Sequence, residues 1–145
     1  MFLDIAIGPP SPVTSRPEEL LVFLPVGYVV TVLVEAPVLL LGLSRRLTTT
    51  RQRLFAGLWL TACTYPIVVL VLPIIFASSP RSEYLLVAET FAPAAECVLF
   101  WLAFARGRGA ETGALVRSFA AVVVANLLSF VAGEVLGVFG WFGLV

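Results

Sequence analysis

Four long apolar segments, separated by short polar breaks, organise the chain. They cover about residues 20–43, 54–77, 84–105 and 114–140. Each has the roughly 20 residues that an α-helix needs to cross the hydrocarbon core of a bilayer. In lipid only helices and closed barrels satisfy every backbone group, and runs of this length are too long for barrel strands. We therefore predict an all-α, polytopic membrane protein whose four transmembrane helices form one domain over residues 20–145.

The segment before the first apolar run has a different character. Residues 1–19 contain a cluster of prolines and lack the basic start of a secretory signal. We expect an extended N-terminal tail there. The three breaks are short, so successive helices should be antiparallel neighbours in two hairpins.

The composition indicates a membrane protein and argues against metal, cofactor and nucleophilic chemistry. Hydrophobic residues make up 60% of the chain and charged residues 12%, against roughly a quarter charged in soluble domains. The chain has no histidine, which is the commonest proton shuttle and metal ligand. It also shows no arrangement of nucleophile and base. We therefore expect no metal, no cofactor, no nucleic-acid partner and no catalytic residue, and we favour a protein that is not an enzyme.

The arginines predict the orientation in the membrane. Seven of them flank the first and third breaks, namely Arg45, Arg46, Arg51, Arg53, Arg106, Arg108 and Arg117. Only Arg16 and Arg81 belong to the other side. Since positive loops stay in the cytoplasm, loops 44–53 and 106–113 should be cytoplasmic and both termini outside. We expect a multi-pass protein of a bacterial inner membrane.

Two glutamates lie near the predicted middle of the membrane. Glu35 comes ten residues before Arg45, and Glu96 comes ten residues before Arg106. At a helical rise of about 1.5 Å per residue, both lie roughly 15 Å from the arginine end. A charged side chain at this depth costs on the order of 3 kcal/mol or more, so such residues usually face the interior of a bundle. Glu35 and Glu96 should therefore face each other inside the protein.

Two further glutamates share an outer level. Glu89 and Glu134 each lie seventeen residues from an arginine of the basic loops, which is roughly 25 Å along a helix. Glu89 is also seven residues from Glu96, so the two lie nearly above one another on one helix face. We treat Glu89 and Glu134 as outer candidates that are hydrated or mark helix ends.

Small and polar residues form one inward stripe on the other helices. The second segment carries Thr61 and Thr64, and the fourth carries Asn126 and Ser129. Spacings of three residues place each pair on one helix face. We expect these four side chains to join Glu35 and Glu96 in a polar centre. Gly133, Gly137 and Gly140 should permit close helix approach.

The polar centre has two interpretations. No base lies at the depth of the central glutamates, so both cannot be ionised unless a cation enters. A buried carboxyl group can hold a proton and exchange it for a cation, which indicates transport of protons, cations or a small cationic substrate. Alternatively, the polar side chains tie the helices together in a structural or assembly subunit of a larger membrane complex. In either case we expect contact with lipid and association as a homodimer or in a larger complex.

The two hairpins look alike, which indicates an internal repeat. Glu35 before a basic loop matches Glu96 before another, and Thr61-x-x-Thr64 matches Asn126-x-x-Ser129. Two parallel hairpins related by a pseudo-two-fold axis along the membrane normal would give this order, and transporters often bind substrate at such repeat interfaces.

From Leu20 onward the chain resembles a family of small, uncharacterised bacterial membrane proteins with four helices. The matching motifs are Glu35, "TACTYP" at 61–66, the Glu89/Glu96 pair and "NLLSFVAG" at 126–133. Thr61 and Tyr65 stand where the family pattern has an amide and an amide or histidine. The resemblance implies the fold and a shared polar centre, and implies no activity.

Overall fold

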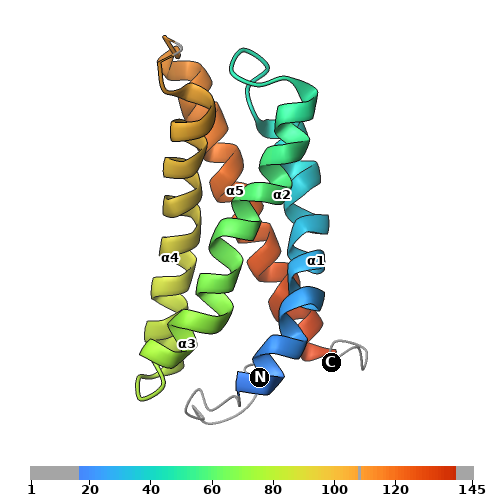
Figure 1. Cartoon of the computed structure of the whole chain (residues 1–145), viewed down its shortest axis with the longest axis vertical. Helices are drawn as coiled ribbons and strands as arrows, with labels where there is room; N and C mark the ends of the chain where they lie inside the picture. Colours follow the sequence, from blue (N-terminus) through green and yellow to red (C-terminus); the bar gives the residue numbers. More distant parts are fainter. Residues whose placement is uncertain (1–16, 108, 140–145) are drawn as a thin grey trace.

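The computed structural model describes residues 17–107 and 109–139 and is built from helices alone over that part of the chain (Figure 1). In order, they are α1 (Pro17–Gly42), α2 (Thr50–Pro66), the π-helix η1 (Ile67–Val71), α3 (Leu72–Ile75), α4 (Arg81–Phe100), the π-helix η2 (Trp101–Ala105) and α5 (Thr112–Val138).

Within the described residues, four stretches are long and apolar enough to cross a membrane. They are Phe23–Gly42, Thr50–Ile75, Arg81–Ala105 and Thr112–Val138. Each belongs to one of the predicted segments, so the prediction of an all-α protein with four membrane-spanning helices is confirmed. The protein is an integral membrane protein whose large apolar side chains on the outside of the bundle, such as Leu33, Leu41 and Leu86, are suited to contact lipid.

The helix boundaries differ from the predicted ones for local reasons. α1 begins at Pro17, three residues inside the predicted tail, and proline is favoured in the first turn of a helix. α2 begins at Thr50, four residues early, because Thr49 and Gln52 form a capping box with reciprocal side-chain to backbone hydrogen bonds. The rest of the predicted tail, residues 1–16, lies outside the described residues.

The second span changes its helical pitch halfway. α2, η1 and α3 follow one another without a break, and the π-turn η1 lies between Pro66 and Pro73. Each proline removes a backbone N–H, so the regular ladder of hydrogen bonds cannot run through this stretch. π-helices are rare and occur mostly as single turns within α-helices, and η1 is one such turn, lying between the two prolines of this span.

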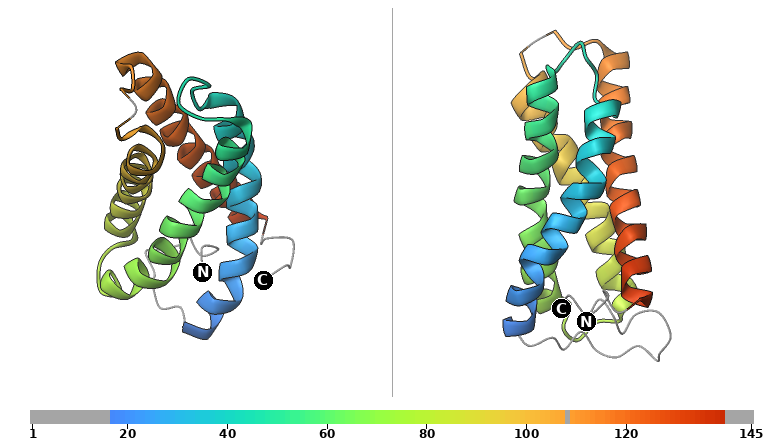
Figure 2. Two further views of the ribbon diagram at one scale, coloured as in Figure 1. Left: turned by 45° about the horizontal axis from the view of Figure 1, so that its top comes forward. Right: turned by 90° about the vertical axis from the view of Figure 1, so that its right-hand side faces the viewer.

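The four spans surround a common centre. α1 packs along both α2 and α5, and α4 packs against the same two helices. α1 and α4 are therefore diagonal partners, and Figure 2 shows α1 between α2 and α5 when the bundle is viewed from the side. Side chains that point inward from α1 and α4 face the same centre.

The end of the bundle with the basic loops is densely packed. Leu39, Leu43, Leu60, Phe100 and Val122 are fully buried there and belong to one apolar cluster. Small residues bring the helices close together, so that a Cβ added at Gly57 would lie 2.9 Å from the Cα and Cβ of Ala36. One added at Gly42 would lie 2.6 Å from the Cβ of Ala121.

Two arginines also stabilise the C-terminal end of α1. Arg53 donates a hydrogen bond to the carbonyl oxygen of Leu40, and Arg117 donates to those of Leu41 and Gly42. The last carbonyls of a helix have no partner within it and carry a partial negative charge. Positive side chains from α2 and α5 therefore complete the end of α1, in addition to any role in membrane orientation.

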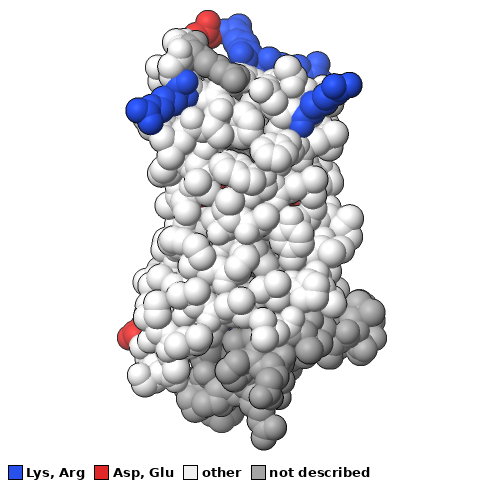
Figure 3. Space-filling view, in the orientation of Figure 1, with Lys and Arg blue, Asp and Glu red and all other residues white. Residues whose placement is uncertain are grey.

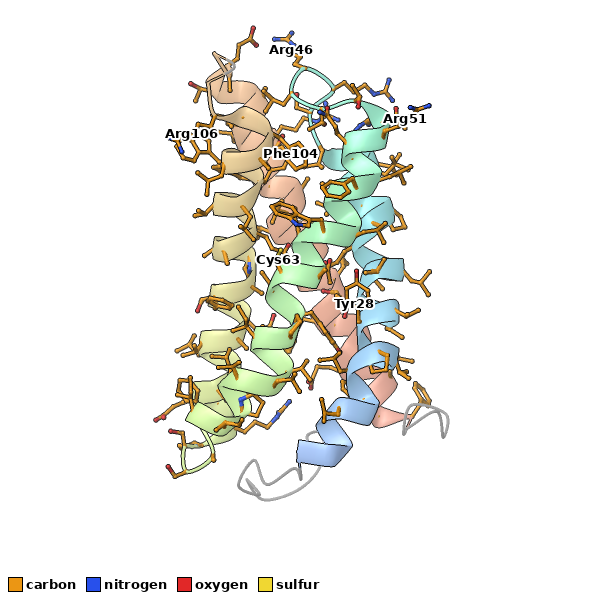
Figure 4. The ribbon with its side chains drawn as sticks, in the orientation of Figure 1. Tyr28, Arg46, Arg51, Cys63, Phe104 and Arg106 are labelled. Carbon is orange, nitrogen blue, oxygen red and sulfur yellow. The ribbon has the colours of Figure 1, made fainter. Side chains whose placement is uncertain are left out.

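Charged side chains on the visible surface lie near the ends of the bundle. In Figure 3 the wide middle of the molecule is almost entirely uncharged, and arginines gather at one end. Arg46, Arg51 and Arg106 all lie at that end (Figure 4). The uncharged belt is the part suited to the hydrocarbon core of a bilayer.

Candidate functional site

The two central glutamates are buried and receive two hydrogen bonds each. Glu35 on α1 is 2% exposed, and its two carboxylate oxygens lie 2.6 Å from the hydroxyl oxygens of Thr61 and Ser129. Glu96 on α4 is 1% exposed, and its oxygens lie 2.7 Å from the Thr64 hydroxyl and 2.8 Å from the Asn126 amide nitrogen. The structure thus brings together all six residues predicted for the polar centre.

The spacing along α2 and α5 explains how two helices serve two glutamates. Thr61 and Thr64 are one helical turn apart on α2, and Asn126 and Ser129 are one turn apart on α5. Residues three apart share a face, so each helix can present one polar group to each diagonal partner.

The hydrogen bonds cross between the two helices. Glu35 accepts hydrogen bonds from the first polar residue of α2, Thr61, and from the second polar residue of α5, Ser129. Glu96 accepts hydrogen bonds from the second polar residue of α2, Thr64, and from the first polar residue of α5, Asn126. The crossed pairing leaves each carboxylate connected to both neighbouring helices.

A cavity of about 90 Å³ adjoins this centre. It extends away from the densely packed end of the bundle and is lined by all six central residues. Glu89, Glu134, Thr31 and Tyr65 also line it. The wall is mostly apolar but carries carboxylates and hydroxyls, and a cavity of this size can hold several water molecules or a small ligand, since one water needs about 10–15 Å³ on this scale. The four intramembrane glutamates therefore share one space.

The two outer glutamates, Glu89 and Glu134, have different surroundings. Glu134 forms an ion pair with Arg81 at 2.9 Å, and both side chains are about a quarter exposed, at 30% and 24%. No hydrogen bond from another described residue reaches Glu89. The predicted outer level thus contains one neutralised carboxylate and one that is free to meet a ligand in the cavity.

The prediction that Gly133 permits close packing is wrong for the helices of the bundle itself, and packing against a partner stays a prediction. Gly133 was expected to bring helices into close contact, yet a Cβ added there would meet no atom within 4 Å. The reason is that Gly133 lies on the wall of the cavity, where no neighbouring helix fills the space. Gly137 is buried, and Gly140 lies outside the described residues.

Sequence reasoning also missed the partner of Glu134. Arg81 was assigned only to membrane orientation, although it starts the helix that is antiparallel to α5. The sequence did contain a signal for this pair. Among the described residues Arg81 is the one arginine at the end of the bundle opposite the basic loops, and Glu134 is the acidic residue of α5 nearest that end.

The two ion pairs found among the described residues should differ in strength. Arg81–Glu134 is mostly covered, whereas the side chains of Arg46 and Glu111 are 73% and 66% exposed. Exposed pairs contribute about 0–1 kcal/mol, and hydrogen bonds to charged groups with less solvent contribute about 1.5–3 kcal/mol. Double-mutant cycles with Arg→Gln and Glu→Gln, read by unfolding in mixed detergent, should therefore give a larger coupling energy for Arg81–Glu134. Equal coupling energies would contradict the expected effect of burial.

The carboxylates are not arranged as a metal site. Within residues 17–107 and 109–139, no three acidic, cysteine or histidine residues form a ligand cluster for one metal ion, so a cation in the cavity would meet fewer than three such side chains. The cavity instead offers separated carboxylates, hydroxyls and aromatic side chains.

No family model, no curated protein and no solved structure matches the chain. The resemblance to small bacterial four-helix proteins therefore stays a prediction.

Proposed function

We propose that this protein is a small membrane carrier, or a part of one, that binds a small monovalent cation or cationic substrate in exchange for protons. The observation that carries the proposal is the cavity in which four intramembrane glutamates meet. Ionisable residues at this depth usually mark ion pathways or proton relays.

The charge balance of the cavity supports a cationic ligand. Four glutamates line it, and within the described part of the chain Arg81 is the one cation in an ion pair with any of them. Carboxylates that lack a cationic partner in low dielectric must hold protons or attract a cation. A cation that enters can therefore replace protons, which is the basis of an exchange.

The aromatic lining favours a cation as well. Phe23, Tyr65 and Phe130 contribute to the cavity wall, and a cation placed over the face of such a ring would gain about 0.5–2 kcal/mol. The volume of about 90 Å³ limits the ligand to a small one.

The position of the cavity suggests a direction of access. With loops 44–53 and 106–113 in the cytoplasm, as the arginines predict, the packed apolar cluster fills the inner half of the bundle. The cavity then occupies the outer half, with Glu35 and Glu96 at its inner limit. We propose that the described arrangement receives its ligand from outside a bacterial inner membrane.

Filling the cavity should abolish the exchange. Gly133→Leu places a large side chain where a Cβ meets no neighbour within 4 Å, so the variant should fold. Gly113→Leu is the matched control, because Gly113 lies on the same helix in equally open space but outside the cavity. Proton movement is measured in proteoliposomes that contain a pH-sensitive dye. It is driven by an imposed gradient of Na⁺ or of tetramethylammonium, and the latter has no neutral form that leaks through lipid.

Cation-driven proton movement should occur with the wild type and with Gly113→Leu, and should fall at least tenfold with Gly133→Leu. Proton movement no faster than in empty liposomes with either cation would overturn the proposed exchange. Equal movement with Gly133→Leu and the wild type would show that the cavity is not the site.

A structural subunit is the second candidate, and the hydrogen bonds favour it specifically. Glu35 links α1 to α2 and α5, and Glu96 links α4 to the same helices. Such bonds between membrane helices contribute about 0.6 kcal/mol on average. If this were the whole role, purification in mild detergent should yield stoichiometric partner proteins, and a Glu35→Gln/Glu96→Gln variant should remain functional.

The crossed hydrogen bonds also support the proposed internal repeat. A pseudo-two-fold axis that exchanges α1 with α4 and α2 with α5 exchanges Glu35 with Glu96 and Thr61 with Asn126. It also exchanges Thr64 with Ser129, and each hydrogen bond of the centre then maps onto another. Association as a homodimer or in a larger complex stays a prediction.

A further inference from the structure

Three hydroxyl groups of the polar centre each have two acceptors. Thr61 lies 2.6 Å from a Glu35 oxygen and 3.1 Å from the carbonyl oxygen of Gly57. Thr64 lies 2.7 Å from a Glu96 oxygen and 3.2 Å from the carbonyl oxygen of Leu60. Since a hydroxyl group has a single hydrogen, each can donate to only one of its two neighbours at a time.

Ser129 repeats this arrangement on the other side of Glu35. Its hydroxyl oxygen lies 2.6 Å from Glu35 and 2.9 Å from the carbonyl oxygen of Asn126. All three hydroxyls that contact a central carboxylate therefore have a carbonyl of their own helix as an alternative acceptor.

Two hydrogen-bond patterns fit the same positions of the heavy atoms. When a glutamate is ionised, the hydroxyl donates its hydrogen to the carboxylate. When the glutamate is protonated, the carboxyl O–H donates to the hydroxyl oxygen, and the hydroxyl turns its hydrogen to the helix carbonyl. Neither state leaves a buried polar group without a partner, which otherwise costs about 1–3 kcal/mol.

Asn126 differs from the hydroxyls and makes Glu96 asymmetric. Its amide nitrogen has two hydrogens, and it donates one to Glu96 at 2.8 Å and one to the carbonyl oxygen of Val122 at 3.0 Å. The Glu96 oxygen that faces Asn126 is thus always an acceptor. A proton on Glu96 must be on the oxygen that faces Thr64.

We propose that the hydroxyls of Thr61, Thr64 and Ser129 form a proton switch, which lets Glu35 and Glu96 gain or lose a proton while their oxygens stay in place. This inference deepens the proposed exchange, on which it rests, and names the proton as the species that the central pair carries. Three hydroxyls with the same double contact, from two different helices, are the observation behind it.

The proton balance of the switch is complete. On release, the O–H bond of the carboxyl group breaks and an O–H bond forms on a base in the cavity, either water or the carboxylate of Glu89. The hydroxyl keeps its own hydrogen and only rotates. The other titratable or charged groups that face the cavity are Tyr65 on the second span and Glu134, held by Arg81, on α5. Cys97, next to Glu96, contacts the carbonyl of Phe119.

Infrared difference spectra between acidic and alkaline pH, recorded on the full chain in lipid nanodiscs, test the switch. The carbonyl stretch of protonated Glu96 is identified by its loss in Glu96→Gln. Thr64→Val has the same shape as the wild type and removes the hydroxyl, so this band should shift to the position of a carboxylic acid whose O–H has no acceptor. Thr64→Ser keeps the hydroxyl and should leave the band in place.

A Glu96 band that stays in place in Thr64→Val would overturn the switch, as would the absence of a Glu96 band in the wild type at every pH. If a Thr64 variant fails to fold, Thr61→Val/Ser129→Ala compared with Thr61→Ser/Ser129→Thr gives the same test for Glu35, where both hydroxyls must be removed because either carboxyl oxygen can hold the proton. These spectra are independent of flux. If the Glu96 band fails to shift while cation-driven flux is intact, the switch fails and the proposed exchange stands. If the band shifts while flux is absent, the proposed exchange fails and the switch stands.

Discussion

Replacing Glu35 and Glu96 together with Gln should abolish cation-driven proton movement and leave the protein folded. The substitution keeps the shape and one oxygen of each side chain but removes the group that titrates. We expect flux in the proteoliposome assay to fall at least a hundredfold, to the level of empty liposomes, with an unchanged helical circular dichroism spectrum.

The protein should tolerate this change because Gln resembles the protonated glutamate in its hydrogen bonds. At position 96 the amide oxygen can accept from Asn126 while the amide NH₂ donates to Thr64, whose hydrogen turns to the Leu60 carbonyl. At position 35 the NH₂ can donate to Thr61, whose hydrogen turns to the Gly57 carbonyl. No buried group loses its partner, so stability should change by less than about 1 kcal/mol.

Glu111→Gln is the matched control for the double variant. It removes the charge of a glutamate at the exposed end of the bundle, outside the cavity, and should leave the flux unchanged. Full activity of the double Gln variant would show that the glutamates serve only to connect helices.

Gly57→Val should destabilise the bundle more than Gly133→Leu or Gly113→Leu does. A Cβ at this position would lie 2.9 Å from the Cα of Ala36, and backbone of α1 cannot move aside as a flexible side chain does. The two helices must separate, and overpacking of a tight contact typically costs about 1–3 kcal/mol, occasionally more. We expect a value of about 3 kcal/mol, because valine adds two further carbon atoms to the clash.

Unfolding in mixed detergent micelles measures this loss. Gly113→Val is the control, since a Cβ there meets no atom within 4 Å and the residue lies near the exposed start of α5. Gly57→Ala should fall between the two, because its smaller clash is partly offset by the higher helix propensity of alanine, about 1 kcal/mol. Equal stability of Gly57→Val and Gly113→Val would contradict the close approach of α1 and α2.

The elements of the fold were predictable because they depend on properties that run along the chain. Segments of more than 20 apolar residues can satisfy their backbone groups in lipid only as helices, and this determined the number of spans. Their ends were predicted less well. The start of α2 depends on the capping box of Thr49 and Gln52, a polar local signal that a hydropathy pattern does not include.

The members of the polar centre were predictable for a similar reason. Counting residues from the arginine loops gave the depth of Glu35 and Glu96, and helical periodicity gave the inward face of Thr61, Thr64, Asn126 and Ser129. Both quantities follow from the geometry of a single helix.

The partners of each residue were not predictable in this way. Whether Ser129 reaches Glu35 or Glu96 depends on the tilt and rotation of α5 against both diagonal helices. The pairing of Arg81 with Glu134 and the open space beside Gly133 depend on the same variables. Packing between helices sets tilt and rotation, and a single sequence shows that packing only as a stripe of small and polar residues.

Proton release on cation binding tests the central claim most directly. The wild-type protein in lipid nanodiscs is held in weak buffer with a pH-sensitive dye, and Na⁺ or tetramethylammonium is added while calorimetry measures binding. We predict that each bound cation releases about one proton, and that the Glu35→Gln/Glu96→Gln variant releases none. Cation binding to the wild type without proton release, or equal release by the double variant, would contradict exchange at the buried glutamate pair.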